Sequence, residues 1–209
     1  TVHFASFSAD GSHLSAVHSN RRLVVWNLDD RTNAYSLADV TWARFSPRLD
    51  LLLAVMSDDS VRMLEGRTGR ELASFKPGGR PSTAAFDSTD DEIAVAVQNK
   101  LHLWNWRTAA RREPFETDQN IWSVAWNDHL LAASESSGEV RVWTLRTKRS
   151  RRLPAHQNAA NHLFFNPAGD LLVSTSYDGS TKVWEPRTGE LLLSTSEGFA
   201  SQFSPDGQH

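Results

Sequence analysis

Three side chains in the last third of the sequence have the composition of a hydrolase triad: His156, Ser176 and Asp178. A catalytic triad needs an exposed nucleophile, a base that takes its proton, and donors that stabilise an oxyanion. A triad must be judged by geometry and roles and not by residue types, and the same side chains also serve to satisfy buried hydrogen-bonding groups. We therefore interpret the set as structural and expect no catalytic residues in this chain.

Two other histidines, His13 and His18, are candidates for metal ligands. They fall in one predicted hairpin, the chain contains 0 Cys, and no further histidine or paired carboxylate stands at ligand spacing around them. The sequence also contains no glycine-rich phosphate loop, no dinucleotide fingerprint and no kinase catalytic motif. The sequence thus predicts a protein with no metal and no cofactor.

Composition narrows the class of partner. The formal net charge of -3 gives no overall attraction to nucleic acid or to an anionic membrane. The longest apolar runs, such as Leu51 to Met56, are too short to cross a bilayer. The absence of cysteine is compatible with a reducing compartment. We expect a cytoplasmic protein whose partners are other proteins or peptides, acidic ones among them.

An internal period organises the whole chain. Five apolar runs end at spacings of 38, 40, 39 and 41 residues, at Trp26, Leu64, Trp104, Trp143 and Trp184. A second aromatic marker recurs at spacings of 38, 41, 40, 39 and 38 residues, at Phe7, Phe45, Phe86, Trp126, Phe165 and Phe203. An Arg-Thr pair follows the first marker in each of the five units. Three markers in step predict a repeat architecture, and they account for the 8 Trp and 10 Phe.

Each period divides into short runs that are typical of strands. Runs such as 171–176 and 180–184 are β-branched or aromatic, and Asp-Gly turns such as Asp178-Gly179 separate them. No stretch of ten or more residues keeps a helical apolar period. The sequence predicts an all-β fold, a β-propeller of four-stranded antiparallel blades. The expected units are 1–38, 39–79, 80–119, 120–158 and 159–197, with a partial sixth at 198–209.

The fifth unit resembles the WD-repeat propellers. It contains Pro154-Ala155-His156, the turn Tyr177-Asp178-Gly179 and the strand end Val183-Trp184-Glu185. The resemblance implies a buried hydrogen-bonded set that holds this blade together, formed by His156, Ser176, Asp178 and Trp184. The other units match less completely, because none has a histidine at the position of His156 and Leu64 replaces the tryptophan in the second unit.

The resemblance extends to the organisation of the parent protein. Five full repeats and a partial sixth are fewer than the seven blades with which this family commonly closes, so we expect a fragment of a seven-bladed, monomeric propeller within a longer chain. The Arg-, Ala- and Trp-rich repeats also resemble bacterial WD-repeat proteins, some of which carry a serine/threonine kinase domain.

Surface chemistry supplies the candidate interaction residues. The turns between the third and fourth strands of the units are rich in arginine, most of all in the fourth unit, with Arg146, Lys148, Arg149, Arg151 and Arg152. This basic set could dock an acidic protein segment. At the opposite end of the strands, Trp122 begins a first strand, and exposed tryptophan is favoured at binding sites.

Three functions are compatible with this pattern. The favoured one is a non-catalytic protein-interaction scaffold formed by WD repeats. An alternative is a sensor or regulatory region attached to a catalytic domain such as a bacterial serine/threonine kinase. A propeller hydrolase is disfavoured, because the positions expected to line the central channel include no carboxylate: His3, Thr41, Ser82, Trp122 and Asn161.

Overall fold

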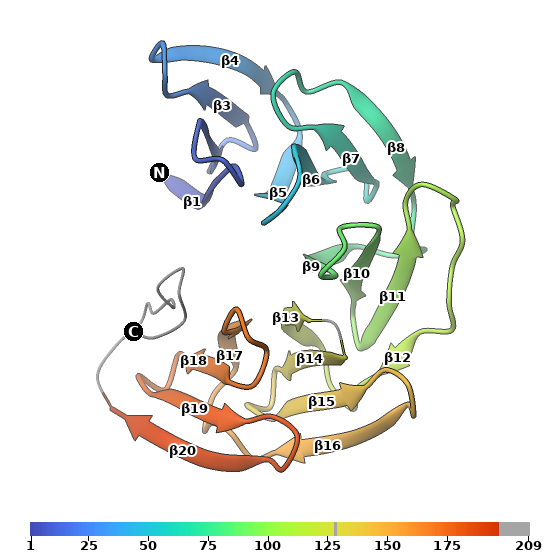
Figure 1. Cartoon of the computed structure of the whole chain (residues 1–209), viewed down its shortest axis with the longest axis vertical. Helices are drawn as coiled ribbons and strands as arrows, with labels where there is room; N and C mark the ends of the chain where they lie inside the picture. Colours follow the sequence, from blue (N-terminus) through green and yellow to red (C-terminus); the bar gives the residue numbers. More distant parts are fainter. Residues whose placement is uncertain (128, 197–209) are drawn as a thin grey trace. The chain divides into compact units, whose positions relative to one another are not determined.

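The structure is a computed structural model that describes residues 1–127 and 129–196. It contains twenty strands in five four-stranded sheets, each an antiparallel meander (Figure 1). This confirms the predicted all-β fold of propeller-type blades. The partial sixth repeat predicted at 198–209 lies outside the described residues. No helix occurs in the described part of the chain, and so none there is long and apolar enough to cross a membrane.

The chain divides into two compact units. The first unit consists of Thr1–Pro81, Thr89–Ile93 and Trp104–Arg111, and the second of Ser82–Ser88, Ala94–Leu103 and Arg112–His209. The third sheet contributes residues to both units, whereas the first two sheets lie in the first unit and the last two in the second. Each unit has a hydrophobic core of its own.

Two sheets make up most of the first unit. One sheet contains β1 (Val2–Phe7), β2 (His13–His18), β3 (Leu23–Asn27) and β4 (Thr32–Leu37). The other contains β5 (Val40–Phe45), β6 (Leu51–Met56), β7 (Val61–Glu65) and β8 (Glu71–Phe75). Strand β5 packs against β1 and β2. The shared core joins Val17, Leu23 and Val25 of one sheet to Ala43 and Leu52 of the other.

The second unit repeats this arrangement. One complete sheet contains β13 (Ile121–Trp126), β14 (Leu130–Glu135), β15 (Val140–Thr144) and β16 (Arg149–Leu153). The other contains β17 (Ala160–Phe165), β18 (Leu172–Ser176), β19 (Thr181–Glu185) and β20 (Glu190–Thr195). Strand β17 packs against β13 and β14. The third sheet has the order β12 (Phe115–Glu116), β11 (Lys100–Asn105), β10 (Glu92–Val97) and β9 (Pro81–Phe86).

Burial follows from the stacking of blades within each unit. Every residue of β6 and of β14 is buried, because a middle strand of a blade is covered by protein on both faces. This explains why Leu51 to Met56 is a continuous apolar run and does not alternate with polar residues. The fourth strands of the second unit are largely exposed: the first four residues of β16 and the first five of β20 are exposed. The first strand β1 is also exposed, at five of its six residues.

A β-bulge recurs near the start of the first strands. In β1, β5, β13 and β17 the pairing register with the next strand shifts after the first residue, so that one residue has no opposite partner. These residues are His3, Thr41, Trp122 and Asn161. They are four of the five positions that the sequence placed on the channel. Because a bulge redirects the side chain of its extra residue, it sets the direction in which Trp122 projects.

Candidate functional site

A chain of hydrogen bonds crosses the fifth sheet. The indole Nε1 atom of Trp184 donates to the Oγ atom of Ser174 at 3.0 Å, and Ser174 Oγ lies 2.8 Å from Nε2 of His156. On the other side of the imidazole ring, Nδ1 lies 2.8 Å from Oγ of Ser180 and 3.3 Å from Oδ2 of Asp178. The strands β18 and β19 and the segment before β17 are thereby joined through one buried imidazole.

The donors and acceptors of this network determine where its protons lie. The hydroxyl of Ser180 donates to Asp178 at 2.6 Å, so its oxygen accepts a hydrogen bond from the Nδ1–H group of His156. The Nε2 atom then accepts from the hydroxyl of Ser174, whose oxygen accepts from Trp184. One neutral tautomer of His156 satisfies every group. Burial lowers the pKa of His156 more than the Asp178 carboxylate raises it, which favours the neutral ring.

Asp178 anchors the turn between β18 and β19 to the segment that precedes β17. One carboxylate oxygen accepts from the backbone N–H of Gln157 at 2.9 Å, and the other accepts from the N–H and the hydroxyl of Ser180. Partial burial acts to raise the pKa of Asp178, but these hydrogen bonds outweigh it and hold the pKa well below its usual range. The carboxylate is therefore ionised at neutral pH.

The serine of this network is Ser174 and not Ser176, which the resemblance had assigned. Trp184 pairs across the sheet with Leu172, so the side chain two residues further on the same face, Ser174, is its diagonal neighbour. Ser176 lies at the end of β18 and donates to the backbone carbonyls of Asn158 and Ala159 at 2.9 and 3.0 Å. Its hydroxyl is thus engaged with the backbone and not with His156, which a triad nucleophile would have to contact.

The fourth sheet has a charged network in place of the histidine network, which sequence reasoning did not find. Glu135, at the end of β14, is 0 % exposed, and its Oε1 atom lies 3.3 Å from Nε of Arg141 on β15. Arg141 also contacts Asp118 at 3.0 Å, and the N–H groups of Asp118 and Gln119 donate to Glu135. The charges join the segment before β13 to the two middle strands. Removing one member of such a buried pair destabilises the fold, because the other charge is then left buried without a partner.

Two exposed aromatic side chains meet at one end of the second unit. Trp122 on β13 is 47 % exposed and Tyr177, in the turn after β18, is 55 % exposed. Their ring centroids are 5.9 Å apart, with the planes at 81° in an edge-to-face arrangement. The sequence predicted Trp122 as an interaction residue but not Tyr177, although the chain has only 2 Tyr. We call these two residues the aromatic pair.

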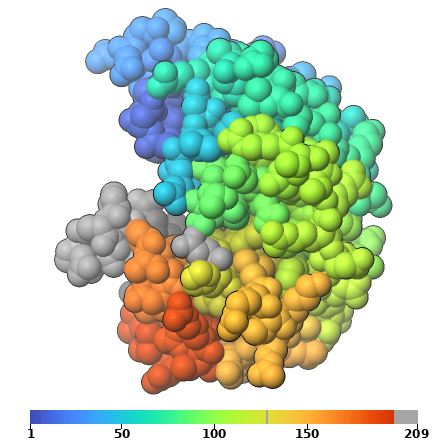
Figure 2. All heavy atoms as spheres, turned by 45° about the vertical axis from the view of Figure 1, so that its right-hand side comes forward, coloured from blue at the N-terminus to red at the C-terminus, as the bar shows by residue number. Residues whose placement is uncertain are grey.

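The basic residues predicted in the fourth unit extend from the turn between β15 and β16, at the other end of this blade, along β16 to Arg152, which pairs with Arg141 near the start of β15. Arg146 and Lys148 are in the turn between β15 and β16, and Arg149, Arg151 and Arg152 are on β16. Figure 2 shows the segment around residue 150 (golden) at the surface of the second unit. Arg152 contacts Asp118 at 2.6 Å, whereas the other four have no ion-pair partner among the described residues. We call Arg146, Lys148, Arg149 and Arg151 the basic hairpin.

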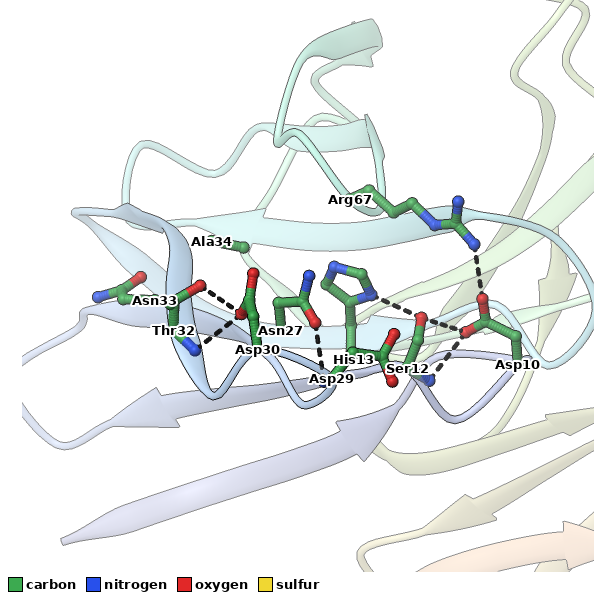
Figure 3. Close-up of a pocket in the computed structure, with 10 residues that line it drawn as sticks. All are labelled: Asp10, Ser12, His13, Asn27, Asp29, Asp30, Thr32, Asn33, Ala34 and Arg67. Atoms are coloured by element: carbon green, nitrogen blue, oxygen red, sulfur yellow. Dashed lines mark hydrogen bonds and ion pairs between the residues drawn. The ribbon is translucent and has the colours of Figure 1, made fainter.

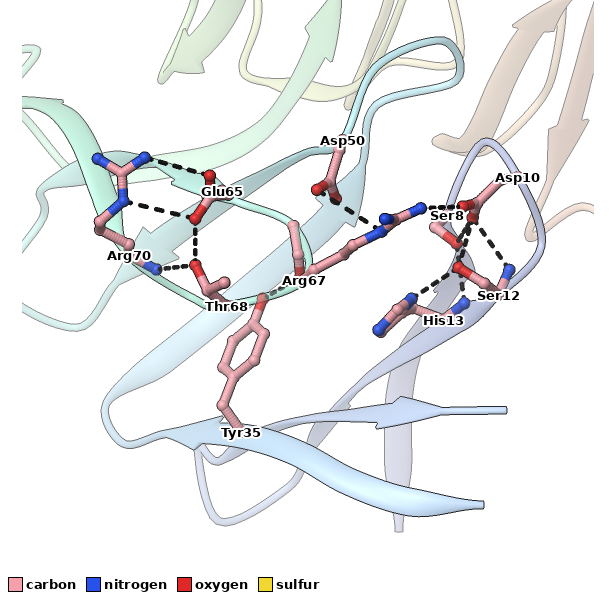
Figure 4. A network of polar contacts seen from close by, with 11 residues as sticks. Ser8, Asp10, Ser12, His13, Tyr35, Asp50, Glu65, Arg67, Thr68 and Arg70 are labelled. Atoms are coloured by element: carbon pink, nitrogen blue, oxygen red, sulfur yellow. Dashed lines mark hydrogen bonds and ion pairs between the residues drawn. The ribbon is translucent and has the colours of Figure 1, made fainter. Parts of the chain in front are cut away.

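Three of the corresponding arginines of the first unit are neutralised by acidic side chains. Arg67 lies 2.7 Å from Asp10 and 3.8 Å from Asp50, and Arg70 lies 3.1 Å from Glu65 (Figure 4). Arg107 lies 2.6 Å from Asp91 in the same way. Acidic side chains thus neutralise Arg67, Arg70 and Arg107, whereas the residues of the basic hairpin have no ion-pair partner in the described chain.

A polar recess lies between turns of the first unit (Figure 3), and sequence reasoning did not find it. Its volume is about 520 Å³. The turns after β1, β3 and β7 form it, and its lining is mostly polar or charged: Asp10, Ser12, His13, Asn27, Asp29, Asp30, Thr32, Asn33, Ala34 and Arg67. No single motif indicated it, because its side chains come from three turns that are far apart in the sequence.

Comparison with known proteins agrees with this architecture. The family model described as "WD domain, G-beta repeat" matches residues 147–185, which contain most of the fifth blade. The chain is 25% identical over 203 residues to apoptotic protease-activating factor 1 of Danio rerio, which covers 92% of this chain and 16% of that protein. It is 32% identical over 210 residues to a periodic tryptophan protein 2 homolog of Dictyostelium discoideum, covering 90% of this chain and 22% of that protein.

A third relative is ribosome assembly protein 4 of Chaetomium thermophilum, 36% identical over 90 residues, or 41% of this chain and 17% of that protein. The chain thus spans less than a quarter of the length of these three relatives. The five sheets are propeller blades with WD-repeat similarity. All three relatives are eukaryotic, so they give no support to the narrower resemblance to bacterial WD-repeat proteins.

Proposed function

We propose that this chain is a non-catalytic protein-interaction platform, and that the aromatic pair of Trp122 and Tyr177 is a contact site for a protein partner. The pair is the observation on which the proposal rests. Two large aromatic side chains, 47 % and 55 % exposed and in edge-to-face contact, project from neighbouring blades of one unit. Tryptophan and tyrosine are enriched at the centres of protein interfaces, where they bury a large area at low entropic cost.

The polar clusters favour a binding role over catalysis. The hydroxyl of Ser174 is enclosed between Trp184 and His156, and that of Ser176 is engaged with two carbonyl oxygens. Neither serine combines exposure with an adjacent base, which a nucleophile needs. Among the described residues no group of three or more histidine or acidic side chains is placed to hold a metal ion. The name of one relative refers to ribosome assembly, which is also consistent with an interaction role.

The basic hairpin is a second contact site in this proposal, and it suits an acidic segment of the partner. Strand direction puts it at the opposite end of the blades from the aromatic pair: Trp122 stands where β13 begins, and Arg146 follows the end of β15. Four exposed cations without ion-pair partners in the described chain would attract a negatively charged segment. The net charge of -3 argues against a nucleic-acid partner.

The test is site-specific photo-crosslinking in the native host. A photoreactive phenylalanine derivative at Tyr177 is expected to capture a defined protein, and Trp122→Ala is expected to reduce that adduct strongly. Leu49→Ala removes an exposed apolar side chain from the first unit and is the matched control, for which we expect no change. Equal crosslinking by the Trp122→Ala and Leu49→Ala variants, or no protein adduct at all, would reject the aromatic pair as a contact site.

A further inference from the structure

One hydrogen-bond acceptor in the polar recess of the first unit is held in a fixed position by the protein. His13 is only 6 % exposed although it lines the recess, and its Nδ1 atom lies 2.8 Å from the Oγ atom of Ser12. The Ser12 hydroxyl donates to Asp10 at 2.7 Å, and a hydroxyl has one proton. The oxygen of Ser12 therefore accepts from Nδ1–H of His13, so that in the neutral ring Nε2 is a free hydrogen-bond acceptor.

This Nε2 atom has no hydrogen-bond partner within the described chain, and Figure 3 shows it on the side of the ring away from Ser12, among the residues that line the recess. The backbone that carries the ring is also fixed. The N–H group of His13 donates to Ser8 Oγ at 2.9 Å, and the hydroxyl of Ser8 donates to Asp10 at 2.7 Å. A nearly buried imidazole is thus fixed with one acceptor directed into an open recess. Such a group is suited to a ligand that donates hydrogen bonds.

Carboxylates supply the charge on the same recess. Asp30 accepts from the N–H and the hydroxyl of Thr32 through a single oxygen, Oδ1, and these bonds hold the pKa of Asp30 below its usual range. Its second oxygen remains free to accept, and so does the carboxylate of Asp29, which has no hydrogen bond or ion pair within the described chain. The one lining arginine, Arg67, is engaged by Asp10 and Asp50. The recess therefore has an excess of negative charge.

We propose that this recess binds the guanidinium group of an arginine side chain from a partner protein, with Asp29, Asp30 and the Nε2 atom of His13 as its acceptors. The inference rests on the proposed function as an interaction platform and adds a third, chemically defined contact. A planar guanidinium has five N–H donors directed in its plane, and it matches several acceptors spread around a recess better than an ammonium group does. A metal ion is a poorer fit, since no group of three or more ligands is placed to hold one in the described residues.

The test uses the intact chain, labelled with nitrogen-15, and N-acetyl-arginine methylamide as the probe. We expect saturable shifts of the amide signals of Ser12, His13, Thr32 and Asn33. The neutral citrulline analogue, which has nearly the same shape, and the lysine analogue are each expected to bind more weakly. The double variant Asp29→Asn/Asp30→Asn keeps the side-chain oxygen that Thr32 needs, and it should weaken binding of the arginine probe by about fivefold.

The control variant is Asp39→Asn/Asp59→Asn, which removes the same charge from the first unit at two positions with φ of 62° and 65°, where asparagine is well tolerated. It is expected to bind the arginine probe like the parent. Absence of shifts at the four amides, equal binding of arginine and citrulline, tighter binding of lysine, or an equal loss in the control variant would overturn the inference. Each of these results would leave crosslinking at Tyr177 unaffected, so failure of the recess is distinguishable from failure of the platform.

Discussion

The Nε2 atom of His156 lies 2.8 Å from the Oγ atom of Ser174, across the buried face of the fifth blade. This contact makes Ser174 the centre of the network, because its hydroxyl donates to the imidazole and accepts from the indole of Trp184 at the same time. The hydrogen bonds run in one direction from Trp184 through His156 to Ser180 and Asp178. Removing any member leaves a buried donor or acceptor unsatisfied.

Ser174→Ala is therefore expected to destabilise the chain by about 1 to 3 kcal/mol, the usual penalty for buried polar groups that lose their partner. The substitution leaves the indole N–H of Trp184 and the Nε2 atom of His156 without partners. The measurement is the free energy of unfolding from urea titration. Ser194→Ala, on the exposed strand β20, is the control and should be close to neutral. A Ser174→Ala variant as stable as this control would contradict the network.

The repeat could be predicted from sequence because its markers are local. Trp184, the Asp178-Gly179 turn and the spacing of the runs identify a blade without knowledge of its neighbours. The choice between Ser174 and Ser176 was not local. Both serines are buried on β18, and only the pairing of Leu172 with Trp184 determines which one the indole reaches.

Features that join distant segments could not be predicted for the same reason. Nothing in the sequence around Arg141 marks it as part of a charged network, because its partners Glu135 and Asp118 come from two other segments. The neutralisation of Arg67 depends on Asp10, 57 positions earlier in the chain. Sequence reasoning identified the elements and the repeat correctly, but it had no means of pairing these charges across turns.

Stability should fall below neutral pH because of His156. Burial lowers the pKa of this imidazole in the folded chain, and the positive charge of Lys182 lowers it further. The carboxylate of Asp178 acts in the opposite direction but does not outweigh them. As the pH falls through about 6.5, the unfolded chain takes up this proton before the folded chain does. The stability that the neutral ring contributes is thus fully present above about 6.5 and is lost as the pH falls towards the lower folded-state pKa, by at most about 1.4 kcal/mol per pH unit.

His156→Gln isolates this effect, since the other seven of the 8 His are common to both proteins. The measurement is urea unfolding of parent and variant at several pH values above about 5, where carboxylates in the unfolded chain remain ionised. The parent is expected to lose more stability on acidification than the variant loses. Parallel pH profiles of the two proteins would show that His156 titrates alike in the folded and unfolded chains.

The charged network of the fourth sheet predicts a non-additive pair of substitutions. Arg141→Met should destabilise the chain by about 3 to 5 kcal/mol, because it leaves the carboxylate of Glu135, which is 0 % exposed, without its cation. The double variant Arg141→Met/Glu135→Met removes both charges and should recover part of this loss. The measurement is a double-mutant cycle, in which the free energy of unfolding is determined for the parent, the two single variants and the double variant. Additive losses would mean that the two charges do not depend on each other.

Gly138 is required by the close approach of two turns. Its φ is +93°, and a Cβ atom there would lie 2.3 Å from the carbonyl oxygen of His156, a backbone atom that cannot rotate away. Gly138→Ala is therefore expected to cost more than about 1 kcal/mol of unfolding free energy. Gly11→Ala is the matched control, because Gly11 also has a positive φ of +72°, but a Cβ atom there would meet nothing within 4 Å. If the two variants melt at the same temperature, backbone strain alone limits both positions.

The basic hairpin should bind an acidic peptide in a salt-dependent manner. The four residues of the basic hairpin have no ion-pair partner in the described chain, so their positive charge is available to a partner from solution. Arg152, by contrast, is paired with Asp118. A fluorescent oligoglutamate peptide is the probe, and its binding is measured by anisotropy at low and at moderate salt. Replacing Arg146, Lys148 and Arg149 by glutamine is expected to weaken binding and to flatten its dependence on salt.

The control for this experiment is the triple replacement of Arg67, Arg70 and Arg107 by glutamine, which removes the same formal charge. Those side chains already contact Asp10, Glu65 and Asp91, so their loss should change peptide binding less. An equal effect of the two triple variants would mean that net charge, and not the hairpin, attracts the peptide. Peptide binding that does not respond to salt would exclude the hairpin altogether, because exposed charges are screened over about 10 Å at ordinary ionic strength.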